Sequence, residues 1–246
     1  FLRRYYTWPD QSPFSSFYHY YHFGLSFEKI REEVAREKPD LVGISSLFSP
    51  YYREVLETAA QIKKVIDVPI LVGGSYVSAC PEEILSSPHV DFVIRGEGER
   101  SIVEFLRAHL NGKNYKAVPN LGFKRNNELV LNPYADNFPI DEIPEPDLSD
   151  LDQKDYLFKN RPLCFVLTSR SCPYQCAFCS VHQTFGKKYR RRSNEKILSE
   201  IEHRYADGFR VFDFEDDNLS FALAEMKDLL RRLIEFSRGK EIELTA

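Results

Sequence analysis

Three thiols lie within eight residues of this chain, at Cys172, Cys176 and Cys179, whereas the whole sequence contains five cysteines. Soft thiolate ligands select zinc or iron-sulfur clusters. The run just before them, residues 163–168, predicts a buried strand because it is short, apolar and rich in bulky side chains. We therefore expect a metal site on a loop at the carboxyl end of a strand, the edge where barrels and open sheets of strand-helix units carry their chemistry.

The spacing of these cysteines, C-x3-C-x2-C, leaves one metal ligand unaccounted for. Zinc ribbons use paired C-x2-C knuckles and ferredoxins use runs of four cysteines, so neither pattern fits. His182, which follows Cys179 closely, is the candidate fourth ligand of a structural Cys3His zinc site, although such sites usually gather ligands from two separated knuckles. A disulfide is disfavoured, because the number of cysteines is odd and the start of the chain does not look like a signal peptide.

The cysteine loop resembles the signature of the radical S-adenosylmethionine (SAM) enzymes, C-x3-C-x-aromatic-C, at Cys172, Cys176, Phe178 and Cys179. The resemblance implies a [4Fe-4S] cluster held by the three cysteines, with Phe178 as a cofactor contact. In that family the open iron of the cluster chelates the amino and carboxylate groups of SAM. An electron from an external donor such as flavodoxin or ferredoxin then cleaves SAM, and the 5′-deoxyadenosyl radical abstracts hydrogen from a substrate.

The composition is that of an ordinary globular protein. With 43% hydrophobic and 28% charged residues, the 246 residues suffice for one large or two modest domains. A net charge of −4 and a pI near 5.9 argue against a general affinity for nucleic acid or anionic membranes, and no apolar run approaches the ~20 residues of a membrane span. Reduced thiols predict a cytoplasmic protein. The resemblance to radical SAM enzymes implies a small-molecule substrate. The basic run 187–192 is either a solvated surface or a contact for a carboxylate or phosphate.

The N-terminal half alternates helices and strands. Ser26 can cap a helix that Pro39 ends, and buried strands are expected at 40–45, 68–72 and 91–94, which predicts a parallel sheet. One helix face between the first two strands is apolar, at Val55, Ala59, Ile62 and Ile66. Small or polar residues follow the strands, at Ser45, Ser46, Gly73, Gly74, Gly96, Glu97 and Gly98. Such glycines are common in tight turns, but they also let a backbone approach a ligand closely.

Residues 26–110 resemble the cobalamin-binding domain that often precedes a radical SAM domain. The matching segments are Lys38–Ser45, Val72–Ser75 and Asp91–Glu99. The resemblance implies a Rossmann-like, doubly wound sheet that holds the corrinoid at the carboxyl ends of its strands, with the small residues there as cobalamin contacts. The first strand of that fold is not evident. The D-x-H-x-x-G motif that supplies a cobalt ligand in other cobalamin proteins has no match either. The most similar segment of this sequence is residues 19–24.

The chain then changes character. Residues 113–160 predict a hairpin over 121–131, with its turn at Asn126 and Asn127, followed by an extended linker rich in proline and acidic residues. We therefore divide the chain into a cobalamin-binding-like domain (1–112), this connecting segment (113–160), and the first strand-helix units of a radical SAM partial TIM barrel (161–246).

Polar residues follow the next predicted strand, residues 210–214, in the layer of the cysteine loop. A run of this kind at the carboxyl end of a barrel strand predicts a site, although an Asx turn could account for Asn218. Radical SAM enzymes place a Gly-Gly-Glu motif here to hold the amino group of SAM. Both glycines are absent, so Glu215, Asp216 and Asp217 all remain candidate SAM contacts. Ser193 can cap the helix before this strand, and a third strand is expected from Glu241.

Taken together, the resemblances imply a cobalamin-dependent radical SAM enzyme that transfers a methyl group to carbon or carries out porphyrin-cyclase-like ring chemistry. A tRNA methylthiotransferase, with the basic run as its RNA contact, is an alternative that the acidic charge disfavours. A non-catalytic zinc module is another. The chain begins at Phe1 and ends in what looks like an opening strand, so we expect a portion of a longer protein. The aromatic-rich residues 1–27 predict a long loop that packs on a neighbouring domain or covers a cofactor.

Overall fold

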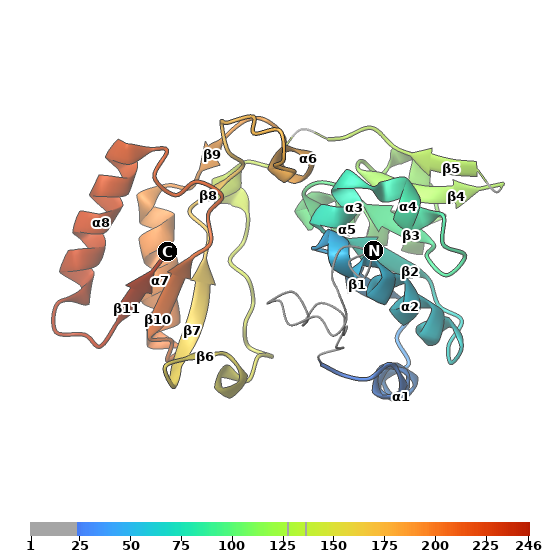
Figure 1. Cartoon of the computed structure of the whole chain (residues 1–246), viewed down its shortest axis with the longest axis horizontal. Helices are drawn as coiled ribbons and strands as arrows, with labels where there is room; N and C mark the ends of the chain where they lie inside the picture. The colour runs from blue at the N-terminus through green and yellow to red at the C-terminus, as the bar shows by residue number, and fades with distance from the viewer. Residues whose placement is uncertain (1–23, 127, 136) are drawn as a thin grey trace, which may run out of the picture.

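The computed structural model describes residues 24–246 except 127 and 136, so the predicted aromatic loop and its histidines fall almost entirely outside the described residues. The described chain forms two α/β units that lie side by side (Figure 1). The first contains α1 (Phe27–Glu37), β1 (Val42–Ser45), α2 (Tyr52–Lys63), β2 (Ile70–Gly73), α3 (Ser75–Ala79), α4 (Pro81–Leu85), β3 (Phe92–Ile94), α5 (Gly98–Leu110), β4 (Leu121–Arg125) and β5 (Glu128–Leu131). The second contains β6 (Leu157–Phe158), β7 (Arg161–Val166), β8 (Ser169–Arg170), α6 (Val181–Phe185), β9 (Arg190–Arg191), α7 (Asn194–Ala206), β10 (Val211–Phe214), α8 (Leu223–Ser237) and β11 (Glu243–Thr245).

The predicted helix caps are confirmed. The Ser26 hydroxyl accepts a hydrogen bond from the Lys29 backbone N–H at 3.3 Å and begins α1, which ends where Lys38 turns left-handed just before Pro39. The Ser193 hydroxyl caps α7 in the same way, accepting from the Lys196 N–H at 3.4 Å. Each cap satisfies a backbone donor that the first turn of a helix leaves free.

The first sheet has the order β1-β2-β3-β4-β5, in which β1, β2 and β3 run parallel. The side chains of successive residues in β2 point to opposite faces of the sheet. Ile70 and Val72 pack with α2 and α4, whereas Leu71 packs with Phe105 of α5. Helices therefore cover both faces, as the doubly wound prediction requires. Because β1 to β3 point the same way, their carboxyl ends meet at one edge of the sheet.

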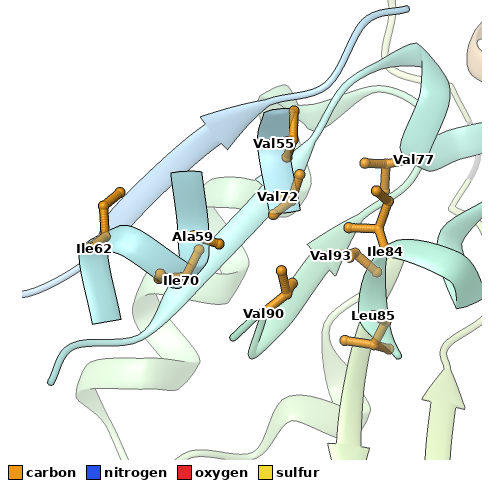
Figure 2. Close-up of a cluster of buried hydrophobic side chains, with 10 residues drawn as sticks. All are labelled: Val55, Ala59, Ile62, Ile70, Val72, Val77, Ile84, Leu85, Val90 and Val93. Carbon is orange, nitrogen blue, oxygen red and sulfur yellow. The ribbon is translucent and has the colours of Figure 1, made fainter. Parts of the chain in front are cut away.

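The core between α2 and the sheet contains the helix face predicted from periodicity. Val55, Ala59 and Ile62 of α2 face Ile70 and Val72 of β2 (Figure 2), and all five are at most 9% exposed. Burying a side chain the size of valine or isoleucine stabilises a fold by about 1.5–3 kcal/mol. This contact holds β2 against α2, and β1 is held in turn by its parallel pairing with β2, so the carboxyl ends of both strands are fixed.

The predicted hairpin is present and belongs to the first sheet. β4 pairs antiparallel with β3, with Phe92 opposite Phe123, and β5 pairs antiparallel with β4. Its turn includes Asn126, whose φ of 51° is left-handed, a conformation that asparagine tolerates. The sheet thus extends past residue 112, and the chain that connects the two units begins only after β5.

The second sheet, β11-β10-β7-β6, contains three parallel strands and the antiparallel edge strand β6. One face packs on α7 and α8: Val166 and Phe212 are fully buried against Ile197 and Leu229. The opposite face carries Phe165, which is 56% exposed. Strands that alternate with helices on one side are the opening units of a barrel, as the sequence predicts. Among the described residues, no helix combines the length and the apolar character needed to cross a membrane.

Candidate functional site

A cleft of about 660 Å³ lies at the carboxyl ends of β1, β2 and β3. The predicted residues in its lining are Ser45, Gly73, Gly74, Gly96, Glu97 and Gly98. Ser46 is the exception: it is only 2% exposed, and its backbone pairs with Gly73 and Tyr76. Gly74 has a φ of +112°, and a Cβ there would come within 2.5 Å of the Ser46 carbonyl oxygen, so this glycine is required by the turn itself.

Other lining residues were not identified from the sequence. Gly43, in the middle of β1, contributes to the cleft, and a Cβ placed on it would meet no protein atom within 4 Å. A glycine inside a strand often marks a place where another group approaches the backbone, which is the signal that could have identified it. Arg170, Thr184 and Phe185 line the cleft from the second unit. The cleft is therefore bounded by both units.

Two arginines of the second unit meet one carboxylate of the first. The Glu97 side chain is 6% exposed and pairs with Arg170, at 3.1 Å between Nη1 and Oε1, and with Arg190, at 3.1 Å between Nη1 and Oε2. Arg170 also reaches Glu99, at 2.6 Å between Nη2 and Oε1. The carboxylate of Glu97, a predicted cofactor contact, is thus occupied by these ion pairs.

The ionisation of Glu99 reflects the same pairing. Burial on its own would raise the pKa of Glu99, but the hydrogen bond and charge of Arg170 outweigh it and hold this pKa below its usual value.

In the predicted basic run, residues 187–192, Lys187 and Lys188 are exposed, whereas Arg190 pairs with Glu97 and Arg192 with Glu200. Arg190 and Arg192 therefore form ion pairs within the protein.

The three cysteines lie on an irregular segment after β8, a two-residue strand that pairs with β9. Cys172 is half-buried, Cys176 and Cys179 are exposed, and all three are free thiols. The Cys179 N–H donates to the Cys176 carbonyl at 3.0 Å, which places these two residues on one turn. Among the described residues, no three Cys, His, Asp or Glu side chains converge as a metal-binding group. A metal held by the three thiols would therefore require these side chains to come closer together than they are in this structure.

His182 is engaged in a hydrogen bond at the start of α6. Its Nε2 lies 2.6 Å from the Cys172 carbonyl oxygen, and because a carbonyl can only accept, Nε2–H is the donor.

Cys164, outside the cysteine segment, is buried in the core of the second unit, and burial above all raises its pKa to about 11. Cys164 is therefore a neutral core residue.

The residues after β10 contact the cysteine segment one after another. The Asp216 carboxylate accepts from the Thr168 N–H at 3.1 Å, from the Thr168 hydroxyl at 2.9 Å and from the Ser169 hydroxyl. Asp217 accepts from the Ser171 N–H; its pKa is raised, first by burial and then by the charge of Asp216. The Asn218 Nδ2 donates to the Cys172 sulfur at 3.6 Å.

These contacts separate the three candidate SAM ligands. Both carboxylate oxygens of Asp216 hold the chain between β7 and β8, and Asp217 holds the residue before Cys172. Glu215 is exposed and its backbone N–H pairs with the Val166 carbonyl, which leaves its side chain on the surface of the site. Phe178, 92% exposed between two cysteines, also presents its ring to the surface.

Comparison with known proteins gives the following relatives. Residues 16–106 match the B12 binding domain family. An uncharacterized methyltransferase of Pyrococcus horikoshii is 32% identical over 90% of this chain and 49% of its own length. The anaerobic magnesium-protoporphyrin IX monomethyl ester cyclase of Rubrivivax gelatinosus is 28% identical over 72% of this chain and 33% of its own length. The chain thus spans half or less of the length of these relatives.

The radical SAM methyltransferase TsrM of Kitasatospora setae is similar in fold. Its structure with tryptophan and a SAM analogue bound superposes with a TM-score of 0.73 and 20% sequence identity, covering 89% of this chain and 45% of TsrM. A second TsrM structure, with cobalamin and a [4Fe-4S] cluster bound, gives a TM-score of 0.71. At this level of identity the likeness establishes the fold.

Proposed function

This chain belongs to the family of radical SAM enzymes that carry a cobalamin-binding domain. From that membership we propose that it binds cobalamin, a [4Fe-4S] cluster and SAM. We propose further that the protein methylates a carbon of a small molecule. The observation that carries the proposal is the cleft at the carboxyl ends of β1 to β3, which residues of the cysteine-bearing unit help to line. A cofactor in this cleft borders the unit that holds the three thiols.

The residues of the cleft fit a large planar ring. Gly43 and Gly98 line it, and a Cβ on either would meet no protein atom within 4 Å, so the space they leave belongs to the cleft. Leu71, Ile94 and Ile102 give it apolar walls. Concave, mostly apolar sites with a few polar groups at the rim are typical of cofactor binding.

The donor set after β8 fits an iron-sulfur cluster. Three free thiols lie on one exposed segment, and His182 already donates its Nε2–H to a carbonyl. Three thiolates without a fourth protein ligand leave one iron open for the amino and carboxylate groups of SAM. When bound, the cluster would supply the electron that cleaves SAM, and cobalamin would supply the methyl group.

The chain's own residues then position these groups. Asp216 and Asp217 hold the backbone on either side of β8, Glu215 remains available for the amino group of SAM, and Phe178 for a flat ring. The Arg170–Glu97 ion pair holds the cleft against the cysteine-bearing unit. Methyl transfer is preferred to cyclase chemistry, because the methyltransferase relative is the more similar of the two.

The alternatives are less well supported. A tRNA methylthiotransferase would use the basic run as an RNA contact, but two of its three arginines are paired inside the protein. A Cys3His zinc module needs His182 as a ligand, and that ring would have to use Nδ1 while Nε2–H remains bonded to the Cys172 carbonyl.

Anaerobic reconstitution with iron and sulfide tests the proposal. We expect a brown, oxygen-sensitive protein with about four irons, which forms 5′-deoxyadenosine when SAM and dithionite are added and which binds hydroxocobalamin. A colourless protein with one zinc would establish the binding module instead. A brown protein that leaves SAM intact and takes up no cobalamin would refute the proposed activity.

A further inference from the structure

Consecutive residues of the turn after β10 contact the stretch 168–172, which leads into the cysteine segment. Asp216 binds Thr168 and Ser169, Asp217 binds the N–H of Ser171, and Asn218 binds the sulfur of Cys172. The bonds therefore run in parallel along both segments. The contacts of Asp216 and Asp217 hold the backbone just before Cys172. A substitution at Asn218 would therefore remove the contact to the Cys172 sulfur and leave that backbone in place.

Aromatic contacts attach the same turn a second time. The centroid of the Phe221 ring lies 4.9 Å from that of Tyr189, with an interplanar angle of 68°. It lies 6.3 Å from the centroid of the Tyr174 ring, with an interplanar angle of 82°. Tyr174 stands between Cys172 and Cys176 in the sequence, so the turn contacts the segment on both sides of Cys172.

Asn218 differs from its two neighbours in what it contacts. Within the part of the chain that the structure describes, it provides the one side-chain donor to a thiol of the cysteine segment, at 3.6 Å from Nδ2 to Sγ. It is half-buried, and its carbonyl accepts from the Phe221 N–H, which fixes the backbone of the residue. The backbone of Asn218 is thus held while its side-chain amide donates to the sulfur.

We propose that Asn218 is a positioning residue that donates a hydrogen bond to the Cys172 thiolate of the cluster and raises the reduction potential of that cluster. The inference rests on the proposed function, because it needs the cluster to be present. Hydrogen bonds to ligating sulfurs are one of the means by which proteins set iron-sulfur potentials. Reduction adds one electron, and so one negative charge, to the cluster; an N–H donor stabilises the more negative state.

The expected size follows from the strength of one hydrogen bond. A neutral hydrogen bond contributes about 1 kcal/mol, so removing it should move the one-electron equilibrium about fivefold toward the oxidised cluster, or ~40 mV to more negative potential. Asn218→Leu removes the donor at nearly constant size. Asn218→Asp replaces it with a negative charge and should lower the potential further.

The test is a potentiometric titration of the reconstituted whole chain with dithionite and mediator dyes, following the reduced cluster by EPR. Ser220→Ala, on the same turn, is the matched control and should keep the wild-type potential. A more negative potential in Asn218→Leu at full iron content supports the proposal; an unchanged potential overturns it. If the leucine variant loads poorly, the potential of Asn218→Asp decides in the same way. Loss of iron from both folded variants counts against the proposal, because assembly should not depend on this bond.

Failure here can be told from failure of the proposed function. If the wild-type protein itself takes up no iron-sulfur cluster, the proposed function is wrong and no potential can be measured. If the wild type holds a cluster with a normal one-electron transition that Asn218→Leu leaves in place, the proposed function stands and the role of Asn218 is wrong.

Discussion

Arg170, on the short strand that leads into the cysteine segment, pairs with Glu97 at the carboxyl end of β3, at 3.1 Å between Nη1 and Oε1. Their side chains are 15% and 6% exposed, so the pair is nearly dry. It connects the rim of the cleft directly to the unit that carries the three thiols. The relative position of the two candidate cofactor sites thus depends on a buried ion pair.

Replacing one member of this pair should destabilise the protein strongly. Glu97→Gln leaves the buried Arg190 without its carboxylate partner and Arg170 with Glu99 alone, and removing one partner of a buried pair typically costs about 3–5 kcal/mol. Urea unfolding at neutral pH measures the loss. Glu33→Gln, which breaks the exposed pair with Arg36, is the control and should cost less than about 1 kcal/mol. Equal, small losses in both variants would contradict the role of Glu97.

The lowered pKa of Glu99 predicts a pH dependence with a definite sign. Because the pKa of Glu99 is lower in the folded than in the unfolded protein, the folded state favours its charged form. Its contribution to stability is complete above the usual glutamate pKa of about 4.3 and is lost as the pH falls through the lower folded value. Unfolding free energies measured from pH 7 downward should therefore fall less steeply in Glu99→Gln than in the wild type. Identical slopes would show that Arg170 does not perturb this carboxyl.

Iron binding should depend on three cysteines and not on the other two. Alanine at Cys172, Cys176 or Cys179 should abolish cluster assembly, since only these share one exposed segment. Alanine at Cys80 or at the buried Cys164 should leave the iron content unchanged, as should His182→Ala. Anaerobic reconstitution followed by iron and sulfide analysis compares all six. Full iron loading of Cys176→Ala would overturn the assignment of the ligands.

Much of the fold is predictable from the sequence because it depends on local patterns. The helix face of Val55, Ala59 and Ile62 follows from its spacing, and the caps at Ser26 and Ser193 follow from residue type. The two-residue strands β8 and β9 have no period to detect. The structure places them before and after the cysteine segment.

The contacts between the units are not predictable in the same way. Glu97 and Arg190 are 93 positions apart, and nothing near either residue indicates its partner. A charged run such as 187–192 is usually solvated, yet Arg190 and Arg192 form ion pairs with largely buried glutamates. The polar run after β10 is recognisable as a site, but only the structure separates Asp216 and Asp217, which hold backbone, from Asn218, which contacts a thiol.

The last prediction concerns cobalamin and uses Gly43. Valine at Gly43 should abolish cobalamin binding, because its side chain would project into the cleft while meeting no protein atom near its Cβ. Gly74 is unsuitable for this test, since its φ of +112° and the nearby Ser46 carbonyl mean that any side chain there strains the turn. Equilibrium dialysis with hydroxocobalamin measures binding, and the iron content should match that of the wild type. Glu128→Val, an exposed substitution in β5 of the same sheet, is the control.

The spectrum of the bound cofactor carries the second half of this prediction. The sequence has no D-x-H-x-x-G motif, so no imidazole from such a motif should reach the cobalt. EPR of the protein-bound cob(II)alamin should therefore lack the nitrogen superhyperfine splitting of an axial imidazole or benzimidazole base. Splitting from a protein nitrogen would show that another histidine ligates the cobalt. Undiminished binding by Gly43→Val would place cobalamin outside the cleft at the ends of β1 to β3.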